Sequence, residues 1–204
     1  MASGLFQRIT GRLIGVKQST ASSSIKRTAK ALAPLSHYFI KLPTVEEMRA
    51  QSNQFFERFH IPNTPLGVDG AFVALGGKPC QNQLPEGLYP QDFFCRKQFY
   101  AINCLVTGDG NFLIRNLVVK WSGSTHDARI WSSSPIKSFI ERYDGQFCVA
   151  ADSAFPISTT LIKPYPRPTC PRKKKFNKCL SGLRTVATEN IIGMWKNRCP
   201  GIHT

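Results

Sequence analysis

Acidic residues are scarce in this chain. Only 12 of its 204 residues are Asp or Glu, against 27 Lys or Arg, which gives a formal net charge of +15. This excess predicts a polyanionic partner, nucleic acid before an acidic membrane surface. Residues 1–45 and 153–188 contain no acid at all. Cations therefore flank a more balanced middle, as they would in an electrostatic clamp.

Long apolar runs are missing too. No stretch of about 18 apolar residues occurs, and the first thirty residues lack the apolar segment of a secretory signal, so we expect neither a membrane span nor export. The seven cysteines are scattered and contain no Cys-x-x-Cys pair, which favours free thiols over disulfides or a zinc site. The 42% apolar content suffices for the core of one domain of about 150 residues with a small appendage.

The amino-terminal segment has the pattern of a helix-turn-helix. Residues 5–14 predict an apolar-rich helix, Gly15 a turn, and residues 18–32 a second helix whose Ala21, Ile25, Ala29 and Leu32 face inward. Polar residues of the second helix then face outward and suit base edges and phosphates: Gln18, Ser19, Ser22, Lys26, Arg27 and Lys30. A basic helical hairpin that packs on the neighbouring domain is the alternative.

Beyond the amino-terminal segment, the spacing of apolar residues changes from that of a helix to that of strands and back to that of a helix. We expect a linking helix at 44–59 that opens with a capping box at Thr44 and Glu47. Three strands follow, at 68–75, 99–106 and 111–121, with a loop at 76–94 after the first and a hairpin turn at 108–110 after the second. Helices are expected from 124 and at 135–143, and then a strand at 147–151. A Pro- and Lys-rich stretch and a helix at 184–198 complete the order. The predicted class is α/β, a mixed sheet flanked by helices. The predicted domains are a helical segment at 1–45, a linking helix at 46–64 and a catalytic domain at 65–204.

This order brings acids from three distant parts of the chain to one sheet edge. Asp69 lies in the first strand, Asp152 directly follows the fourth, and Glu189 lies on the last helix. Carboxylate oxygens are the ligands that Mg2+ and Mn2+ prefer. Two such ions, about 3.5–4 Å apart, activate the attacking oxygen and stabilise the leaving oxygen in phosphodiester cleavage.

Each acid also has an ordinary structural explanation. Asp69 could end a strand, although an Asp inside an apolar strand is unfavourable without a partner. Asp152 could cap a turn. Glu189 falls opposite the apolar stripe Leu183, Ala187, Ile191 and Met194, which is typical of a solvated residue. Asp127 is a fourth candidate ligand, or an acid at a helix start favoured by the helix dipole.

Several phrases resemble the PIF/Harbinger superfamily of DDE transposases and the nuclease-like proteins derived from it. The matching phrases, in the family's order and separations, are Gly67–Gly70, Arg96-Lys97 to Asn103, Gly123–Trp131, Ala151–Pro156, Pro164-Tyr165, Phe176-Asn177 and Arg184–Glu189. The 36 residues between Asp152 and Glu189 are close to the family's usual separation. The segments at 13–20 and 42–48 resemble the region upstream of the family's catalytic domain.

The resemblance implies an RNase H-like fold in which Asp69, Asp152 and Glu189 bind two divalent ions, Mg2+ or Mn2+. It further implies double-stranded DNA as substrate, a nuclear location and a Myb-like partner protein. The outward residues of the second helix would read DNA, and a basic segment would hold its backbone, although a lysine run also serves as an import signal or a solvated patch. That segment comprises Arg172, Lys173, Lys174, Lys175 and Lys178, with Lys163 and Arg167 before it.

The chain also departs from the family's pattern at four places. Ala71 and Phe72 replace a polar pair after the first acid, Ala151 replaces Gly before the second, and Asn190 replaces Arg after the third. These changes keep open a domesticated protein of the same fold that binds DNA, or acts as an adaptor, without cleaving.

Overall fold

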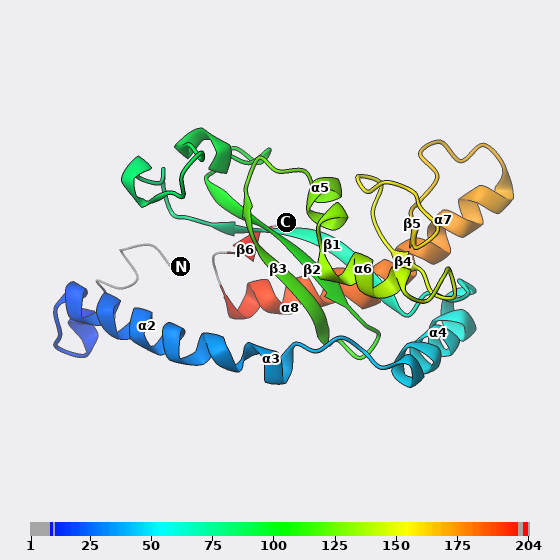
Figure 1. Ribbon diagram of the computed structural model, residues 1–204, viewed down its shortest axis with the longest axis horizontal. Coiled ribbons are helices and arrows are strands. Elements are labelled where there is room, and N and C mark those ends of the chain that lie inside the picture. The colour runs from blue at the N-terminus through cyan, green and yellow to red at the C-terminus, as the bar shows by residue number, and fades with distance from the viewer. Residues whose placement is uncertain (1–8, 10, 200–201, 204) are drawn as a thin grey trace.

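The computed structural model describes residue 9, residues 11–199 and residues 202–203, the side chains of residues 83, 202 and 203 excepted. A mixed β-sheet with strand order β3-β2-β1-β4-β5 lies at its centre (Figure 1). The strands are β1 (Leu66–Ala74), β2 (Ala101–Gly108), β3 (Ile114–Ser122), β4 (Val149–Ala150), β5 (Leu161–Ile162) and β6 (Ile202–His203). The predicted α/β class with a mixed sheet is confirmed.

Strand β1 is central and has different partners along its two edges. On one edge β2 runs antiparallel from the Gly67–Gly108 pair to the Ala74–Ala101 pair, and β3 runs antiparallel to β2. On the other edge β4 is parallel, with Leu66 opposite Val149, and β5 continues parallel to β4. β6 pairs antiparallel with the far end of β1. Strands β1 to β4 and the hairpin between β2 and β3 were predicted from the sequence, whereas β5 was not.

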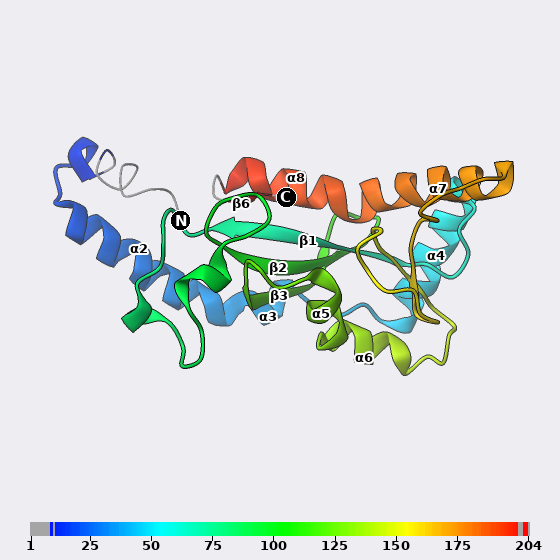
Figure 2. The ribbon, with the colours of Figure 1, turned by 90° about the horizontal axis from the view of Figure 1, so that it is seen from above.

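Helices cover both faces of the sheet (Figure 2). On one face a nearly continuous helix consists of α7 (Pro171–Arg184), the π-helical turn η4 (Thr185–Glu189) and α8 (Asn190–Arg198). On the other face lie α5 (Asp127–Ser132) and α6 (Pro135–Glu141), which form the crossover to β4. Buried apolar residues fill both layers, with Trp131, Ile136 and Leu105 on the α5–α6 side and Leu183 and Ile191 on the α7–α8 side.

Helix α4 (Val45–Phe59) confirms the predicted capping box. The Thr44 hydroxyl accepts a hydrogen bond from the Glu47 amide at 3.2 Å, and the Glu47 carboxylate accepts one from the Thr44 amide at 2.8 Å. His60 ends the helix in the left-handed region at φ 57°. Buried Met48 and Phe55 bind α4 to the edge of the domain, beside α7.

The amino-terminal region is an extended helical arm at one end of the molecule (Figures 1 and 2). Residues 11–13 are helical, Gly15 turns at φ +72°, and α2 (Gln18–Leu32) follows, then η1 (Ala33–Leu35) and α3 (Ser36–Phe39). Residues 5–8 and 10 of the first predicted helix lie outside the described residues. The predicted inward face is wrong except for Ala21, because Ile25, Ala29 and Leu32 are exposed. The arm has no packing partner for this face in the described part of the chain.

Two other local predictions are corrected. The turn between β2 and β3 is longer than the predicted 108–110, since the Asp109 carboxylate accepts hydrogen bonds from the amides of Asn111 (2.9 Å) and Leu113 (3.1 Å) and closes a loop. The Pro- and Lys-rich stretch is helical from Pro171, which occupies the first turn where its missing N–H costs nothing. Between β1 and β2 the predicted loop contains only the short 3-10 turns η2 (Gln81–Gln83) and η3 (Pro90–Phe93).

All seven cysteines are free, as the sequence predicted. Among the described helices, none combines the length and the apolar character needed to cross a membrane.

Candidate active site

Asp69 lies in β1, and Asp152 lies two residues beyond the neighbouring parallel strand β4, after buried Ala151. The pairs Leu66–Val149 and Gly67–Ala150 set the register of β1 and β4, so Asp69 and Asp152 each follow the last pair by two residues, and the charge of Asp152 raises the pKa of Asp69. The Asp152 carboxylate accepts a hydrogen bond from the Ala154 amide at 2.8 Å. The two acids are therefore neighbours at one sheet edge.

The edge of β1 is open at Asp69. On this side β4 pairs with residues 66–67 and β6 with residues 72–73, so within the described chain no strand covers residues 68–71. Alternation along the strand puts Asp69 on the same face as Gly67 and Ala71. A Cβ on Gly67 would approach Ala187 to 2.8 Å, and Ala71 packs with Ile191. Asp69 therefore faces the long α7–α8 helix.

Arg184, at the end of α7, connects Asp69 to Glu189. Its Nη2 donates to Asp69 Oδ2 at 2.8 Å and lies 3.7 Å from Glu189 Oε1. The Thr185 hydroxyl donates to Glu189 Oε2 at 2.8 Å. Glu189 itself is exposed, as its position opposite the apolar stripe predicted, yet this network holds it beside the sheet edge. The structure thus links two of the predicted triad positions, Asp69 and Glu189, through a residue that the sequence did not single out.

A π-helical turn carries Glu189. The Asn190 amide bonds to the Thr185 carbonyl, five residues earlier, and Val186, Ala187 and Thr188 are buried in succession. The extra residue in this turn shifts the phase of the helix, so that buried Ile192 rather than exposed Met194 continues the inner face. Single π turns of this kind occur frequently at functional sites.

Charge repulsion and burial act together on Asp69. Burial raises the pKa of its carboxyl to about 6, while the Arg184 guanidinium lowers this pKa and the neighbouring Asp152 raises it. Part of the carboxyl population is therefore protonated near neutral pH without a further cation. A divalent ion shared with Asp152 would relieve both the desolvation and the repulsion.

Asp127 has a different environment. It begins α5 as predicted, but it is buried, and its Oδ1 accepts a hydrogen bond from Asn103 Nδ2 at 2.8 Å. A Cβ on Gly70 would meet the Asp127 carboxylate at 2.6 Å, so the acid packs behind β1, on the face opposite Asp69. Burial raises its pKa, with smaller lowering contributions from Asn103 and Arg96 and a raising one from Asp152. Asp127 is thus at a helix start, as predicted, but its carboxylate is buried and hydrogen-bonded to Asn103.

The donors fit a hard divalent cation by their chemistry. Asp69, Asp152 and Glu189 offer only carboxylate oxygens, which Mg2+ and Mn2+ prefer. Within the described residues, no group of three or more Asp, Glu, His or Cys side chains converges as a ready metal site. The Arg184 guanidinium lies between Asp69 and Glu189, where it supplies the positive charge.

Comparison with known proteins decides the family. The family model described as DDE superfamily endonuclease matches residues 76–200, well over half of the chain. The chain belongs to the DDE superfamily endonucleases. The match includes Asp127, Asp152, Arg184 and Glu189, whereas Asp69 lies upstream of it.

Curated relatives of this DDE endonuclease chain extend over almost all of it. "Putative nuclease HARBI1" of Rattus norvegicus is 24% identical over 191 residues, 93% of this chain and 52% of the relative. The Homo sapiens protein of that name is 25% identical over 186 residues, 90% of this chain and 51% of that protein. The chain thus spans about half the length of the curated relatives it matches. No solved structure matches. These findings confirm the resemblance to Harbinger-derived proteins.

The predicted DNA-binding cations lie at both ends of the DDE domain. Arg172, Lys174, Lys175 and Lys178 are exposed on α7, and Lys173 lies 5.1 Å from the centre of the Tyr165 ring. With a rise of 1.5 Å per residue, the start of α7 is about 20 Å from Arg184 along the helix. Residues of α2 occupy the opposite end of the molecule: Gln18, Ser19, Ser22, Lys26, Arg27 and Lys30, of which only Ser22 is partly buried.

Arg184 and Asn103 are the residues of this site that sequence reasoning missed. Both lie inside the family-motif phrases, and this position was the signal by which the sequence could have identified them. A further buried acid, Asp109, has a structural role. Arg115 Nε donates to it at 2.6 Å, and Arg115 Nη2 donates to Glu47 at 3.1 Å, so the pair ties the β2–β3 loop to α4.

Proposed function

We propose that this chain is a metal-dependent endonuclease that cleaves DNA phosphodiester bonds with Asp69, Asp152 and Glu189. One observation carries the proposal: Asp152 follows the strand parallel to β1 and acts electrostatically on Asp69, and Arg184 links Asp69 to Glu189. The strand order β3-β2-β1-β4-β5, with three antiparallel strands followed by parallel ones, supports an RNase H-like fold. Family membership supports the reaction class.

The acids of this chain would have distinct tasks. Asp69 and Asp152 would hold Mg2+ or Mn2+, and Glu189, on an exposed helical turn, would complete the donor set. When bound, a pair of such ions activates the attacking oxygen and stabilises the leaving oxygen. Asp69 must first lose its proton, and Arg184 must release the Asp69 and Glu189 carboxylates. Arg184 is then free to contact a phosphate.

Substrate binding follows from the charge distribution. Cations at the start of α7 and along α2 would hold the backbone of duplex DNA on either side of the acids, with α2 reading base edges. From a DNA substrate we infer a nuclear location, and from the family resemblance a Myb-like partner protein. The exposed, unpacked face of α2 is available for either contact.

Cleavage and metal binding can be measured separately. We expect the parent chain with Mn2+ to nick supercoiled plasmid, and Asp152→Asn to lower the rate by a hundredfold or more while leaving the affinity for DNA in EDTA nearly unchanged. The matched control is Glu57→Gln, which removes an exposed carboxylate on α4. Equal nicking by the parent and Asp152→Asn would contradict the assignment.

A non-cleaving DNA-binding protein is the second candidate. Arg184 between Asp69 and Glu189, together with apolar Ala71 and Phe72 beside the first acid, favours it. In that case calorimetry would detect salt-dependent DNA binding but no heat from Mn2+, in the parent and in Asp152→Asn alike.

A further inference from the structure

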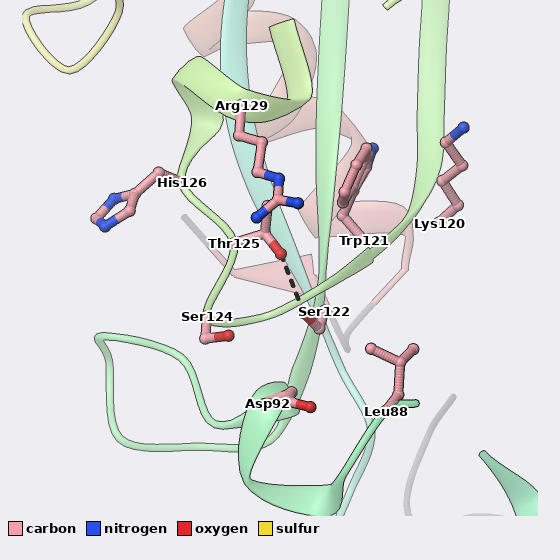
Figure 3. A pocket seen from close by; sticks show the side chains of 9 residues that line it. All are labelled: Leu88, Asp92, Lys120, Trp121, Ser122, Ser124, Thr125, His126 and Arg129. Carbon is pink, nitrogen blue, oxygen red and sulfur yellow. Dashed lines mark hydrogen bonds between the residues drawn. The ribbon is translucent and has the colours of Figure 1, made fainter. Parts of the chain in front are cut away.

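A cavity of about 560 Å3 opens beside β3 and is lined by none of the three acids (Figure 3). Its walls come from the loop at 88–92, the end of β3 and the turn that precedes α5. The Ser124 amide donates to the Asp92 carbonyl at 2.9 Å, so a backbone hydrogen bond fixes two of these walls to each other. Pockets of about 300–1,000 Å3 commonly bind small organic groups.

One wall of this cavity combines an aromatic ring with two cations. Arg129 Cζ lies 5.8 Å and Lys120 Nζ 5.6 Å from the centre of the Trp121 ring. The Arg129 guanidinium extends into the cavity beside that ring in Figure 3. Neither cation has a carboxylate within ion-pair distance in the described part of the chain. The indole Nε1 of Trp121 is buried and lacks a hydrogen-bond partner among the described residues.

The rim is polar and predominantly cationic. Ser124 and His126 line it beside the two cations, and Asp92 is the carboxylate that faces it. Asp92 Oδ2 already accepts a hydrogen bond from the Tyr89 amide at 2.7 Å. A ligand that offers a flat ring to Trp121 and Arg129, and an anion to the cations, matches this wall. A nucleotide has both parts.

The cavity leads toward the acids. Residues 124–126 line both this cavity and a smaller one of about 80 Å3, whose other walls include Asn103, Asp127 and Ala154. Ala154 follows Asp152 by two residues, and buried Asn103 Oδ1 has no hydrogen-bond partner among the described residues. The turn at 124–126 therefore separates the larger cavity from a smaller one that extends to within two residues of Asp152.

We propose that the Trp121 cavity binds one unpaired nucleotide of the DNA strand, next to the phosphate that is cleaved. A paired base is stacked inside the duplex, so only a flipped or single-stranded nucleotide can enter a cavity. The base would stack on the Trp121–Arg129 wall, and Lys120 would contact the adjacent phosphate. This inference rests on the proposed function. It adds that the DNA substrate has an unpaired nucleotide next to the cleaved phosphate.

The test compares two DNA probes in EDTA, so that binding is measured without cleavage. One probe is a blunt duplex and the other is the same duplex with a short single-stranded tail. Stacking of one base contributes about 1–3 kcal/mol, so we expect the parent chain to bind the tailed probe about tenfold more tightly. Arg129→Ala should abolish this preference, while Arg129→Lys should restore only part of it. Arg142→Ala is the matched control, because Arg142 is an exposed cation at the end of α6 that does not line the cavity, so the preference should stay intact.

The outcomes separate this inference from the proposed function. If Arg129→Ala keeps the tail preference while Asp152→Asn loses Mn2+-dependent nicking, the nucleotide site is refuted and the nuclease stands. If Arg129→Ala loses the preference but the parent never nicks DNA, the nucleotide site stands alone. A free deoxynucleoside monophosphate that competes as well as the tailed probe would instead identify a mononucleotide site and overturn the role in strand binding.

Discussion

Replacing Asp69 by Asn is expected to stabilise the metal-free protein at pH 8. Burial raises the pKa of the Asp69 carboxyl from its ordinary 3.8 to about 6, against the attraction of Arg184 and with added repulsion from Asp152. Lys196 of α8 is a second cation that interacts electrostatically with Asp69. Because each tenfold change in proton affinity corresponds to about 1.4 kcal/mol, ionising Asp69 costs the folded chain about 3 kcal/mol.

The sign of the pH dependence follows from this direction. A carboxyl whose pKa rises on folding adds stability below its ordinary pKa, and that stability is lost as the pH rises through the folded value. The parent should therefore lose about 2.5 kcal/mol of unfolding free energy between pH 4 and pH 8 relative to Asp69→Asn. For a chain of this size, the melting temperature of Asp69→Asn at pH 8 should exceed that of the parent by about 6–12 °C.

Urea unfolding in EDTA, followed by tryptophan fluorescence at pH 4.5, 6, 7 and 8, measures this difference. Glu86→Gln is the control, because Glu86 is an exposed carboxylate in the β1–β2 loop. Added Mn2+ should stabilise the parent more at pH 8 than at pH 5 and should do little for Asp69→Asn. An Asp69→Asn protein less stable than the parent at pH 8, or one with the parent's pH dependence, would refute the reasoning.

Three further predictions concern other residues. Asp127→Ala leaves a buried amide donor unpaired, so chemical denaturation should show a loss of about 1–3 kcal/mol in unfolding free energy. The affinity for Mn2+, measured by calorimetry, should be nearly unchanged. If this variant lost more Mn2+ affinity than Asp152→Asn, the triad would have to be reassigned. Arg184→Gln removes a competing cation, so the Kd for Mn2+ at pH 8 should fall several-fold. A rise in this Kd would mean that Arg184 holds Asp69 and Glu189 in place for the ion. Replacing Lys173, Lys174 and Lys175 together by Ala should lower the slope of log Kd for duplex DNA against log salt by up to about 3; an unchanged slope would leave the cluster as an import signal.

Local patterns predicted those parts of the fold that short-range physics decides. Alternating apolar residues located β1, β2 and β3 to within a few residues, because the two-residue period is a property of each strand alone. The capping box at Thr44 and Glu47 was predictable for the same reason. The motif phrases pointed to the family, and the order of elements placed Asp69 and Asp152 on neighbouring strands.

Helix α7 shows where local patterns were insufficient. Its first turn carries Pro171 and several cations, which are unfavourable near the positive end of the helix dipole. Leu180 and Leu183 are fully buried against Phe55 of α4, and burying each side chain contributes about 1.5–3 kcal/mol. Packing against a distant helix thus outweighs the local preference, and the helix begins earlier than its sequence pattern indicates.

The sequence by itself determined the cationic surface, the periods of the central strands, the family motifs and the three acids. Only the tertiary structure decided that Arg184 joins Asp69, which lies 115 residues away, and Glu189. It also decided that Asp127 is buried behind Gly70 and that Trp121 faces a cavity with Arg129. The reason is physical: such contacts depend on which strands pair, and on which face each helix packs, so no local period specifies them.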